Sequence, residues 1–311
     1  MSPFSDRHLK SLRDFFGQSL STNEPLSAHC TYRIGGPAEY FISLSSEEKL
    51  SQGLEYCHEE HIPVMVLGRG SNILFPDEGL HGVVVQTVAN EVVFQNDNAI
   101  VQAGTPLPKL ARSAAEHSLS GLEFASGIPG TAGGAVIMNA GFKGQCMGDI
   151  VDKVSGYELI GRKFSIDKEQ LEFRYRSSSL RNARKLLTQV VLRLSPGGPE
   201  EIKKRMADFN KERRNNQPIE YPSAGSVFKN PPERPAWKLI EEAGCKGLRV
   251  GNAQVSEKHG NYIINLGNAT YNDVKKLIEI VVERVCNTSG IMLDLEILDI
   301  GTGPQRRKEL Q

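Results

Sequence analysis

A glycine-rich segment is the part of the chain best suited to bind a ligand. Residues 121–144 read GLEFASGIPGTAGGAVIMNAGFKG and hold seven glycines and one proline in 24 residues, among apolar neighbours. Glycine has no Cβ, so another backbone or a ligand can approach it closely. Ordering so many glycines costs conformational entropy. In return their main-chain N–H groups can face a phosphate or a flat ring, and this is the chemistry that we expect here.

A second glycine cluster, LGRGSN at 67–72, follows an apolar strand. It lacks the third glycine of the GxGxxG dinucleotide fingerprint, and the extended, proline-containing Ile73–Asp77 follows it where that fingerprint needs a helix. The chain has no GxxxxGK[ST], which excludes a P-loop. A tight turn would explain this cluster equally well. Together with residues 127–134, however, it predicts one shared phosphate site.

Three polar side chains elsewhere have both a chemical and a plain interpretation. On the plain interpretation, Arg176, which precedes a serine run, is a solvated surface charge, and Ser226, in AGSVF, is a turn serine. The segment 291–298 alternates apolar and polar residues, which predicts a strand with Asp294 and Glu296 on its polar face. The same alternation predicts that Arg174 and Arg176 share one strand face.

Composition excludes several classes of protein. The 311 residues include 37 basic and 37 acidic ones, so the net charge indicates neither nucleic acid nor an anionic membrane as partner. The five cysteines show no CxxC spacing and the histidines no HExxH or HxH, so we expect reduced thiols and no metal site. The charged N-terminal stretch and the lack of a long apolar run predict a soluble, cytoplasmic protein without signal peptide or spanning helix.

The pattern of elements predicts an α+β protein of several units. We expect helices at 5–17 with Ser5 as cap, from a Ser45–Glu48 capping box to His58, at 107–119, at 200–215, and after a Thr270–Asp273 capping box. Strands are expected at 64–67, 83–86 and 186–194, and as a hairpin around 96–98. The predicted divisions are 1–20 (helix), 21–88 and 89–198 (two β-rich subdomains), 199–302 (third domain) and 303–311 (charged tail).

Six motifs in order resemble one known family. They are HCTYRIGGPA at 29–38, LGRGSN at 67–72, GLEFASGIPGTAGGAVIMNAG at 121–141, FRYRSSSL at 173–180, PSAGSVFKNP at 222–231 and LEILDIG at 295–301. This order is similar to that of the UDP-N-acetylenolpyruvoylglucosamine reductases, over about residues 24 to 302. The short distance from Arg176 to the strand at Leu186 resembles the shorter branch, which lacks a tyrosine-bearing loop.

The resemblance implies a fold, a reaction and partners. The fold is a two-subdomain FAD-binding unit of the vanillyl-alcohol-oxidase type, followed by an α+β substrate domain. NADPH would reduce a non-covalently bound FAD, which would reduce UDP-N-acetylglucosamine enolpyruvate to UDP-N-acetylmuramate for peptidoglycan. The implied protein is a cytoplasmic monomer with no nucleic-acid or membrane partner.

The resemblance also implies roles for individual residues. Arg176 would bind the substrate carboxylate, Ser226 would donate the proton, and Glu296 would hold a proton and hydrogen-bond the carboxylate. Contacts with substrate are implied for Tyr175, Lys229, Asn230 and His259. Contacts with FAD are implied for Arg33, Gly35, Gly36, Gly68, Gly70, Ser71, Asn72, Gly127, Ile128, Pro129, Gly130, Thr131, Gly133, Gly134, Ala135 and Asn139.

Two alternatives stay open at this point. A flavin-dependent oxidase of the same fold would share the cofactor loops but pass electrons to oxygen. A non-catalytic nucleotide-binding module would use the same loops without any need for Ser226.

Overall fold

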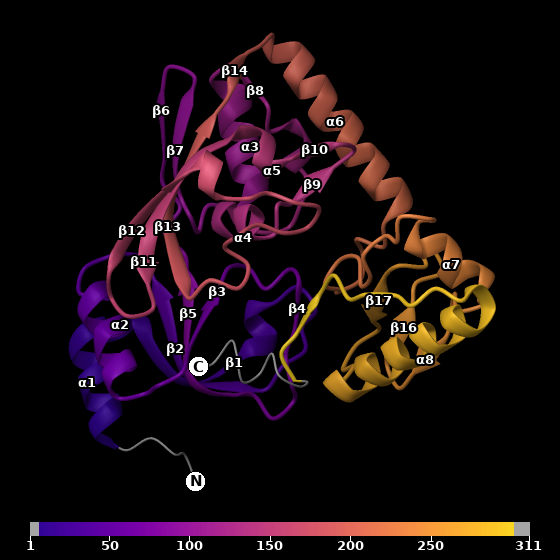
Figure 1. The fold of residues 1–311 in the computed structure, drawn as a ribbon, viewed down its shortest axis with the longest axis horizontal. Helices are drawn as coiled ribbons and strands as arrows, with labels where there is room; N and C mark the ends of the chain where they lie inside the picture. Colours follow the sequence, from indigo (N-terminus) through magenta and orange to yellow (C-terminus); the bar gives the residue numbers. More distant parts are fainter. Residues whose placement is uncertain (1–5, 302–311) are drawn as a thin grey trace.

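The structure is a computed structural model and describes residues 6–301. Its first subdomain is a four-stranded sheet in the order β1-β2-β5-β3, in which β1 is antiparallel to β2 and the other neighbours are parallel. Two helices cover one face of this sheet (Figure 1). The elements are α1 (Asp6–Phe16), β1 (Leu20–Pro25), β2 (Pro37–Leu44), α2 (Leu50–Glu59), β3 (Val64–Leu67), β4 (Ile73–Leu74) and β5 (Leu80–Thr87).

The sequence predicted the end of α1 correctly but not the start of α2. The predicted cap Ser5 lies outside the described residues, and α1 ends before Gly17, whose φ of 53° stops the helix as expected. The predicted capping box at Ser45 is wrong: α2 begins only at Leu50, after Lys49 at a φ of 57°, with no side-chain cap. Burial of one apolar side of α2 governs its position more than the capping signal does.

The second subdomain is an antiparallel five-stranded sheet in the order β12-β11-β13-β7-β6, with short helices packed against it. The predicted hairpin at 96–98 is confirmed as the β6–β7 pair. The helix predicted to reach residue 119 ends at Glu116, because Ser118 turns the chain at a φ of 56°. The main elements are β6 (Val92–Gln95), β7 (Asn98–Gln102), α3 (Leu107–Glu116), α4 (Ala132–Ile137), α5 (Met147–Ile150), β11 (Val151–Glu158), β12 (Lys163–Asp167) and β13 (Lys185–Arg193).

Helix α6 (Pro199–Asn216) connects the second subdomain to the third unit (Figure 1). Its residues Met206 and Phe209 pack on the core of the second subdomain, and Arg205 pairs with the buried Glu123 at 2.7 Å. Helix α6 therefore still packs on the core of the second subdomain, and the third unit begins after it. The sequence suggested that the boundary between the second subdomain and the third domain lies at residue 198.

The third unit contains α7 (Ala236–Glu242), the small antiparallel sheet β15 (Arg249–Val250), β16 (Ala253–Val255) and β17 (Ile263–Asn265), and α8 (Tyr271–Ser289). The predicted Thr270–Asp273 capping box is confirmed at the start of α8. The final strand β18 (Leu298–Asp299) returns to the first subdomain and pairs with β4 in parallel. Remaining short strands are β8 (Leu119–Ser120), β9 (Gly141–Phe142), β10 (Gln145–Cys146) and β14 (Ser195–Pro196).

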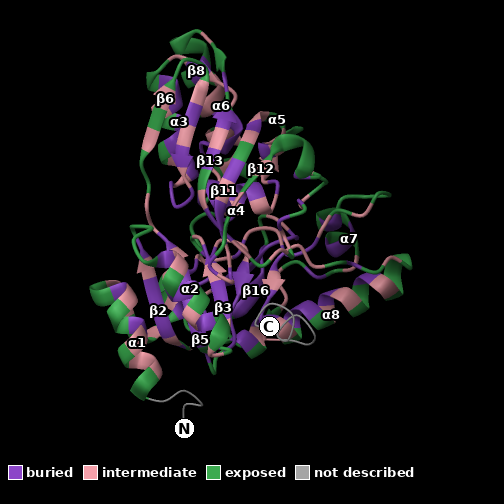
Figure 2. Cartoon of the chain, turned by 60° about the vertical axis from the view of Figure 1, so that its left-hand side comes forward, coloured by how far each residue is buried: buried purple, intermediate pink, exposed green. Residues whose placement is uncertain are grey.

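One hydrophobic core joins the first subdomain to the third unit. Leu67 and Phe75 belong to the same buried cluster as Val227, Leu277 and Ile297. Figure 2 shows the buried residues concentrated in the central strands, with α1 and α8 exposing one side. The shared core fixes the third unit against the loop that follows β3.

Candidate functional site

The two glycine clusters lie against each other. A Cβ added to Gly68 would sit 2.8 Å from Oγ1 of Thr131, and one added to Gly130 would sit 3.3 Å from Oγ of Ser71. Side chains at these glycines would fill the space between the two loops. The prediction that the clusters form one shared surface is therefore consistent with their placement.

Several main-chain donors on this surface have no acceptor within the part of the chain that the structure describes. Among residues 6–301, the N–H groups of Arg69, Gly70, Ser71, Gly130 and Thr131 make no hydrogen bond. Neither loop contains a carboxylate side chain. Since unpaired N–H groups near the interior are costly, such a surface fits an anionic ligand such as the pyrophosphate of FAD.

Three glycines predicted to contact the cofactor lie where the chain packs too closely for a side chain, whereas Arg33 is exposed. A Cβ on Gly36 would overlap the carbonyl oxygen of Asp77, one on Gly35 would sit 2.7 Å from Phe75, and one on Gly133 would sit 2.9 Å from Ala103. These glycines allow close backbone packing. Arg33 is exposed at a φ of 56°.

The remaining members of the predicted cofactor set differ in exposure. Thr131 caps α4 through its Oγ1, which accepts from the N–H of Gly134 at 3.3 Å. Asn139 is buried and uses both ends of its amide, donating to the carbonyl of Arg174 and accepting from the N–H of Gly148. These bonds make Asn139 a support for the segment that carries Arg176. Ala135 is buried, Ile128 is half-buried and Pro129 is exposed.

Hydrogen bonds bring Glu296, and the segment that directly follows Ser226, next to the first glycine loop. The N–H of Glu296 donates to the carbonyl of Val227 at 2.8 Å, and Phe228 forms a β-bridge with Leu295. Asn72 donates from its side chain to the carbonyl of Glu296 at 3.1 Å. The predicted strand 291–298 is wrong in extent, because only this bridge and β18 have strand pairing. The expectation that Asp294 is more exposed than Glu296 is confirmed.

Arg176 lies in a tight turn. Arg174 and Ser177 exchange two main-chain hydrogen bonds, of 2.9 and 3.1 Å, and Arg176 has a φ of 54°. The prediction that Arg174 and Arg176 share a strand face is therefore wrong. A non-glycine residue in this conformation is under backbone strain of about 1–2 kcal/mol, and such strain often occurs at functional sites.

The turn places Arg176 against Glu296. Its Nε lies 2.7 Å from Oε1 of Glu296, although the N–H is not aligned for a hydrogen bond. Burial raises the pKa of the Glu296 carboxyl above its usual value, and this effect outweighs the opposing influence of Arg176, Arg181 and Lys229. Glu296 therefore keeps its proton to a higher pH than an ordinary glutamate, as expected for its implied role.

Two residues of this cluster were missed by the sequence analysis. Tyr262 is buried close to Ser226, and Arg213 of α6, Arg176 and Glu296 act on its hydroxyl electrostatically. Burial raises the pKa of Tyr262, so the phenol stays protonated at neutral pH. No local sequence signal marks either residue, because each depends on a contact between separate elements.

The four residues predicted to contact substrate lie around the same cluster. Tyr175 is exposed, its ring lies 5.2 Å from the guanidinium carbon of Arg176, and its hydroxyl accepts from Asn230 at 3.3 Å. Lys229 is half-buried near Glu296. His259 packs edge-on against Tyr262 at 5.0 Å between ring centroids, and burial lowers its pKa.

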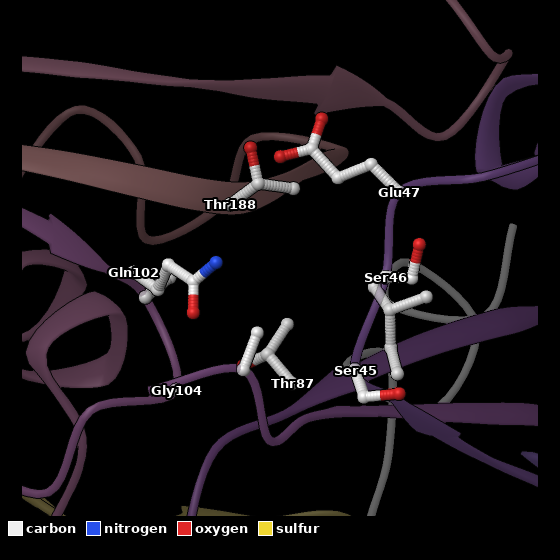
Figure 3. Close-up of a pocket in the computed structure, with 10 residues that line it drawn as sticks. Ser45, Ser46, Glu47, Thr87, Gln102, Gly104 and Thr188 are labelled. Atoms are coloured by element: carbon white, nitrogen blue, oxygen red, sulfur yellow. The ribbon is translucent and has the colours of Figure 1, made fainter. Parts of the chain in front are cut away.

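A cavity of about 300 Å³ lies between the first and second subdomains, and Ser226 does not line it. It is found at the carboxyl ends of β2 and β5, and polar side chains including Glu47, Thr87, Gln102 and Thr188 line it (Figure 3). No lysine or arginine lines it. Such a cavity suits an uncharged polar group better than a phosphate.

Residues 6–301 contain neither a metal-binding cluster nor a membrane-spanning helix. No group of three or more His, Cys, Asp or Glu side chains is arranged to hold a metal ion. No helix in this range combines the length and apolarity that crossing a membrane requires.

The fold and the site define an FAD-dependent oxidoreductase with a separate C-terminal unit. Residues 38–163 match the FAD binding domain, and residues 217–300 match the C-terminal domain of UDP-N-acetylenolpyruvoylglucosamine reductase. The chain belongs to the UDP-N-acetylenolpyruvoylglucosamine reductase family. The expected fold class is thereby confirmed.

Individual relatives support this family membership. The chain is 46% identical over 283 residues to the UDP-N-acetylenolpyruvoylglucosamine reductase of Moorella thermoacetica, covering 91% of this chain and 93% of that protein. It is 40% identical over 306 residues to reductase 2 of Symbiobacterium thermophilum, covering 98% and 99%. The crystal structure of the Thermus caldophilus reductase matches with a TM-score of 0.77 at 38% identity, covering 90% of this chain and 97% of that one.

Proposed function

We propose that this chain reduces UDP-N-acetylglucosamine enolpyruvate to UDP-N-acetylmuramate for peptidoglycan synthesis, with NADPH as reductant and FAD as cofactor. Family membership over more than nine tenths of the chain supports this activity. The observation that carries the assignment to residues is the gathering of Arg176, Ser226 and Glu296 beside a loop of unpaired main-chain N–H groups.

The two glycine loops would hold FAD by its pyrophosphate. The unpaired N–H groups of residues 69–71 and 130–131 would donate to phosphate oxygens. Asn72, at the end of the first loop, is bonded to Glu296, so the isoalloxazine ring would lie at this end. The adenosine half would extend the other way, toward the cavity at Thr87 and Thr188, which has no basic side chain in its lining.

The bound FAD would supply hydride transfer to the enolpyruvyl group, and the chain's own residues would manage charge and protons. The Arg176 guanidinium would bind the substrate carboxylate, and protonated Glu296 would donate a hydrogen bond to the same group as negative charge develops on it. Tyr262 would donate to Oγ of Ser226, which leaves the serine proton directed at the carbon that receives it.

The surrounding residues would position the substrate. Tyr175, Lys229, Asn230 and His259 lie around the reacting cluster and would contact the UDP-sugar. We further propose that the working unit is a monomer. We place the enzyme in the cytoplasm, where NADPH is available.

An anaerobic half-reaction experiment tests the activity. NADPH should bleach the yellow protein, and the UDP-enolpyruvyl sugar should then restore the colour rapidly without oxygen. Ser226→Ala should leave the flavin spectrum and its bleaching unchanged. It should slow recolouring by more than the roughly 10²–10⁴-fold typical of a lost general acid.

The alternatives give different results in the same experiment. Recolouring that requires oxygen and ignores the UDP-sugar would indicate an oxidase of the same fold. A protein that remains colourless with added FAD would contradict the assignment of the cofactor. Full recolouring by Ser226→Ala would remove Ser226 from the chemistry and favour a module that merely binds nucleotide.

A further inference from the structure

A buried asparagine lies beside the segment that follows Ser226. Asn261 is 3% exposed and belongs to the turn that leads from His259 to Tyr262. Its Oδ1 accepts from the N–H of Phe228 at 2.9 Å, and its Nδ2 donates to the carbonyl of the same residue at 2.8 Å. The side-chain amide thus exchanges two hydrogen bonds with one residue, as the partner residue on a neighbouring strand would.

The main-chain groups of Phe228 fix the orientation of this amide. A main-chain N–H can only donate and a main-chain carbonyl can only accept, so Oδ1 of Asn261 must face the N–H and Nδ2 the carbonyl. Reversing the amide would place donor against donor and acceptor against acceptor. A side chain of similar size that lacks either group therefore leaves a buried main-chain group of Phe228 without a partner.

The other main-chain groups after Ser226 are held as well. The N–H of Val227 donates to the main-chain carbonyl of Asn261 at 2.9 Å, and the carbonyl of Val227 accepts from the N–H of Glu296 at 2.8 Å. The segment that follows the serine is thus bonded on one edge to residues 294–296 and on the other to the Asn261 side chain.

The same turn also supplies an aromatic neighbour of the serine. Tyr262 follows Asn261 in the chain and is buried close to Ser226. One turn therefore meets the serine segment twice, at its main chain through Asn261 and near its hydroxyl through Tyr262. Replacing the Asn261 side chain tests the first of these contacts separately from the second.

We propose that Asn261 is a positioning residue for Ser226: its amide acts as an edge strand and fixes the main chain that carries the serine hydroxyl. The inference rests on the proposed role of Ser226 as proton donor. A general acid works only within hydrogen-bond reach of the atom that receives its proton. A misplacement of about 1 Å can cost about a hundredfold in rate, so the main chain under the hydroxyl must be held firmly.

The test compares the two half-reactions of the FAD-loaded protein in the absence of oxygen. Asn261→Ala removes two side-chain bonds, neither of which involves the glycine loops. We expect NADPH to bleach the flavin at the rate of the unaltered protein. At saturating UDP-enolpyruvyl sugar, recolouring should slow about 10–100-fold, which is the effect of two lost hydrogen bonds. A general loss of structure would impair both half-reactions.

Asn265→Ala is the matched control. Asn265 is also 3% exposed, and its side chain donates to the carbonyl of Tyr32 at 3.0 Å and accepts from the N–H groups of Gly267 and Ala269 at 2.8 and 3.0 Å. Its replacement should lower the melting temperature, because buried hydrogen bonds are lost. None of these bonds reaches residues 226–229, so recolouring should stay near the rate of the unaltered protein.

Two further variants isolate the action through Ser226. Asn261→Asp keeps the shape of the side chain and an acceptor for the N–H of Phe228, but it places an oxygen where Nδ2 donates. It should therefore slow recolouring as well. In Ser226→Ala the hydroxyl is absent, so adding Asn261→Ala to it should slow recolouring no further.

Three results would overturn the proposal. The first is recolouring of Asn261→Ala at the rate of the unaltered protein, and Asn261→Asp decides this point if Asn261→Ala does not fold. The second is equal slowing by Asn265→Ala. The third is a double variant slower than Ser226→Ala by the full factor seen for Asn261→Ala alone. Failure of the unaltered protein to recolour with the sugar would instead contradict the proposed function itself.

Discussion

Nε of Arg176 lies 2.7 Å from Oε1 of Glu296, so a strained turn of the second subdomain meets the C-terminal segment of the chain. The contact pairs a group that always carries positive charge with a carboxyl whose pKa burial raises. This pair lies at the centre of the proposed reaction. Its chemistry and its geometry lead to the first two predictions.

Glu296→Gln should remove a pH dependence. Because burial raises the folded pKa of Glu296, its protonated form is present below that value and is lost as the pH rises through it. The kcat/KM of the unaltered enzyme should therefore fall on the alkaline side. Glu296→Gln, which always donates, should show no such fall, whereas Glu296→Ala should lose about 10–100-fold at every pH. An alkaline fall that persists unchanged in Glu296→Gln would assign the titration to another group.

Arg176 and Arg174 form a matched pair for substitution by alanine. Arg176→Ala should lower kcat/KM by about a hundredfold or more, because a charged, fork-shaped donor to the carboxylate is lost. Arg174 has an exposed side chain, 3.7 Å from Glu172, and its replacement should change little. Arg176→Gly should be as inactive as Arg176→Ala, yet melt no lower than the unaltered protein, since glycine relieves strain of about 1–2 kcal/mol. Equal losses at positions 174 and 176 would argue against the assigned role.

Gly133 and Gly134 should respond differently to alanine. A Cβ at Gly133 would sit 2.9 Å from the Cβ of Ala103, so Gly133→Ala should destabilise the fold by about 1–3 kcal/mol. At Gly134 the nearest atom would be Oγ1 of Thr131 at 3.4 Å, and alanine in α4 should stabilise by up to about 1 kcal/mol. Gly134→Ala should nevertheless weaken FAD binding. Thermal melting of apoprotein and FAD titration measure the two effects, and unweakened FAD binding would place α4 outside the cradle.

Tyr262→Phe should slow proton delivery without weakening substrate binding. The hydroxyl proposed to donate to Ser226 is lost, while the ring and its packing on His259 remain. We expect flavin reoxidation by substrate to slow about tenfold, the effect of one hydrogen bond, with KM nearly unchanged. Stopped-flow absorbance at the flavin band measures this rate. A raised KM with an unchanged rate would make Tyr262 a binding residue instead.

Local sequence signals determined the elements whose formation depends on neighbours in the chain. The β6–β7 hairpin and the capping box of α8 follow from residues within a few positions of each other, and both are confirmed. The two glycine clusters predicted a surface of unpaired N–H groups, which the structure contains. The family resemblance then supplied the roles of Arg176, Ser226 and Glu296, which residue types alone left open.

Tertiary structure decided where those groups meet. Alternation predicted that Arg174 and Arg176 share a strand face, but hydrogen bonds to Ser177 and Asn139 close the segment into a turn. Tyr262 has no local signal, because the groups around it come from separate elements. The raised pKa of Glu296 likewise depends on burial between domains. Contacts over long sequence separations are set by how the shared cores pack, which periodicity within a single segment does not encode.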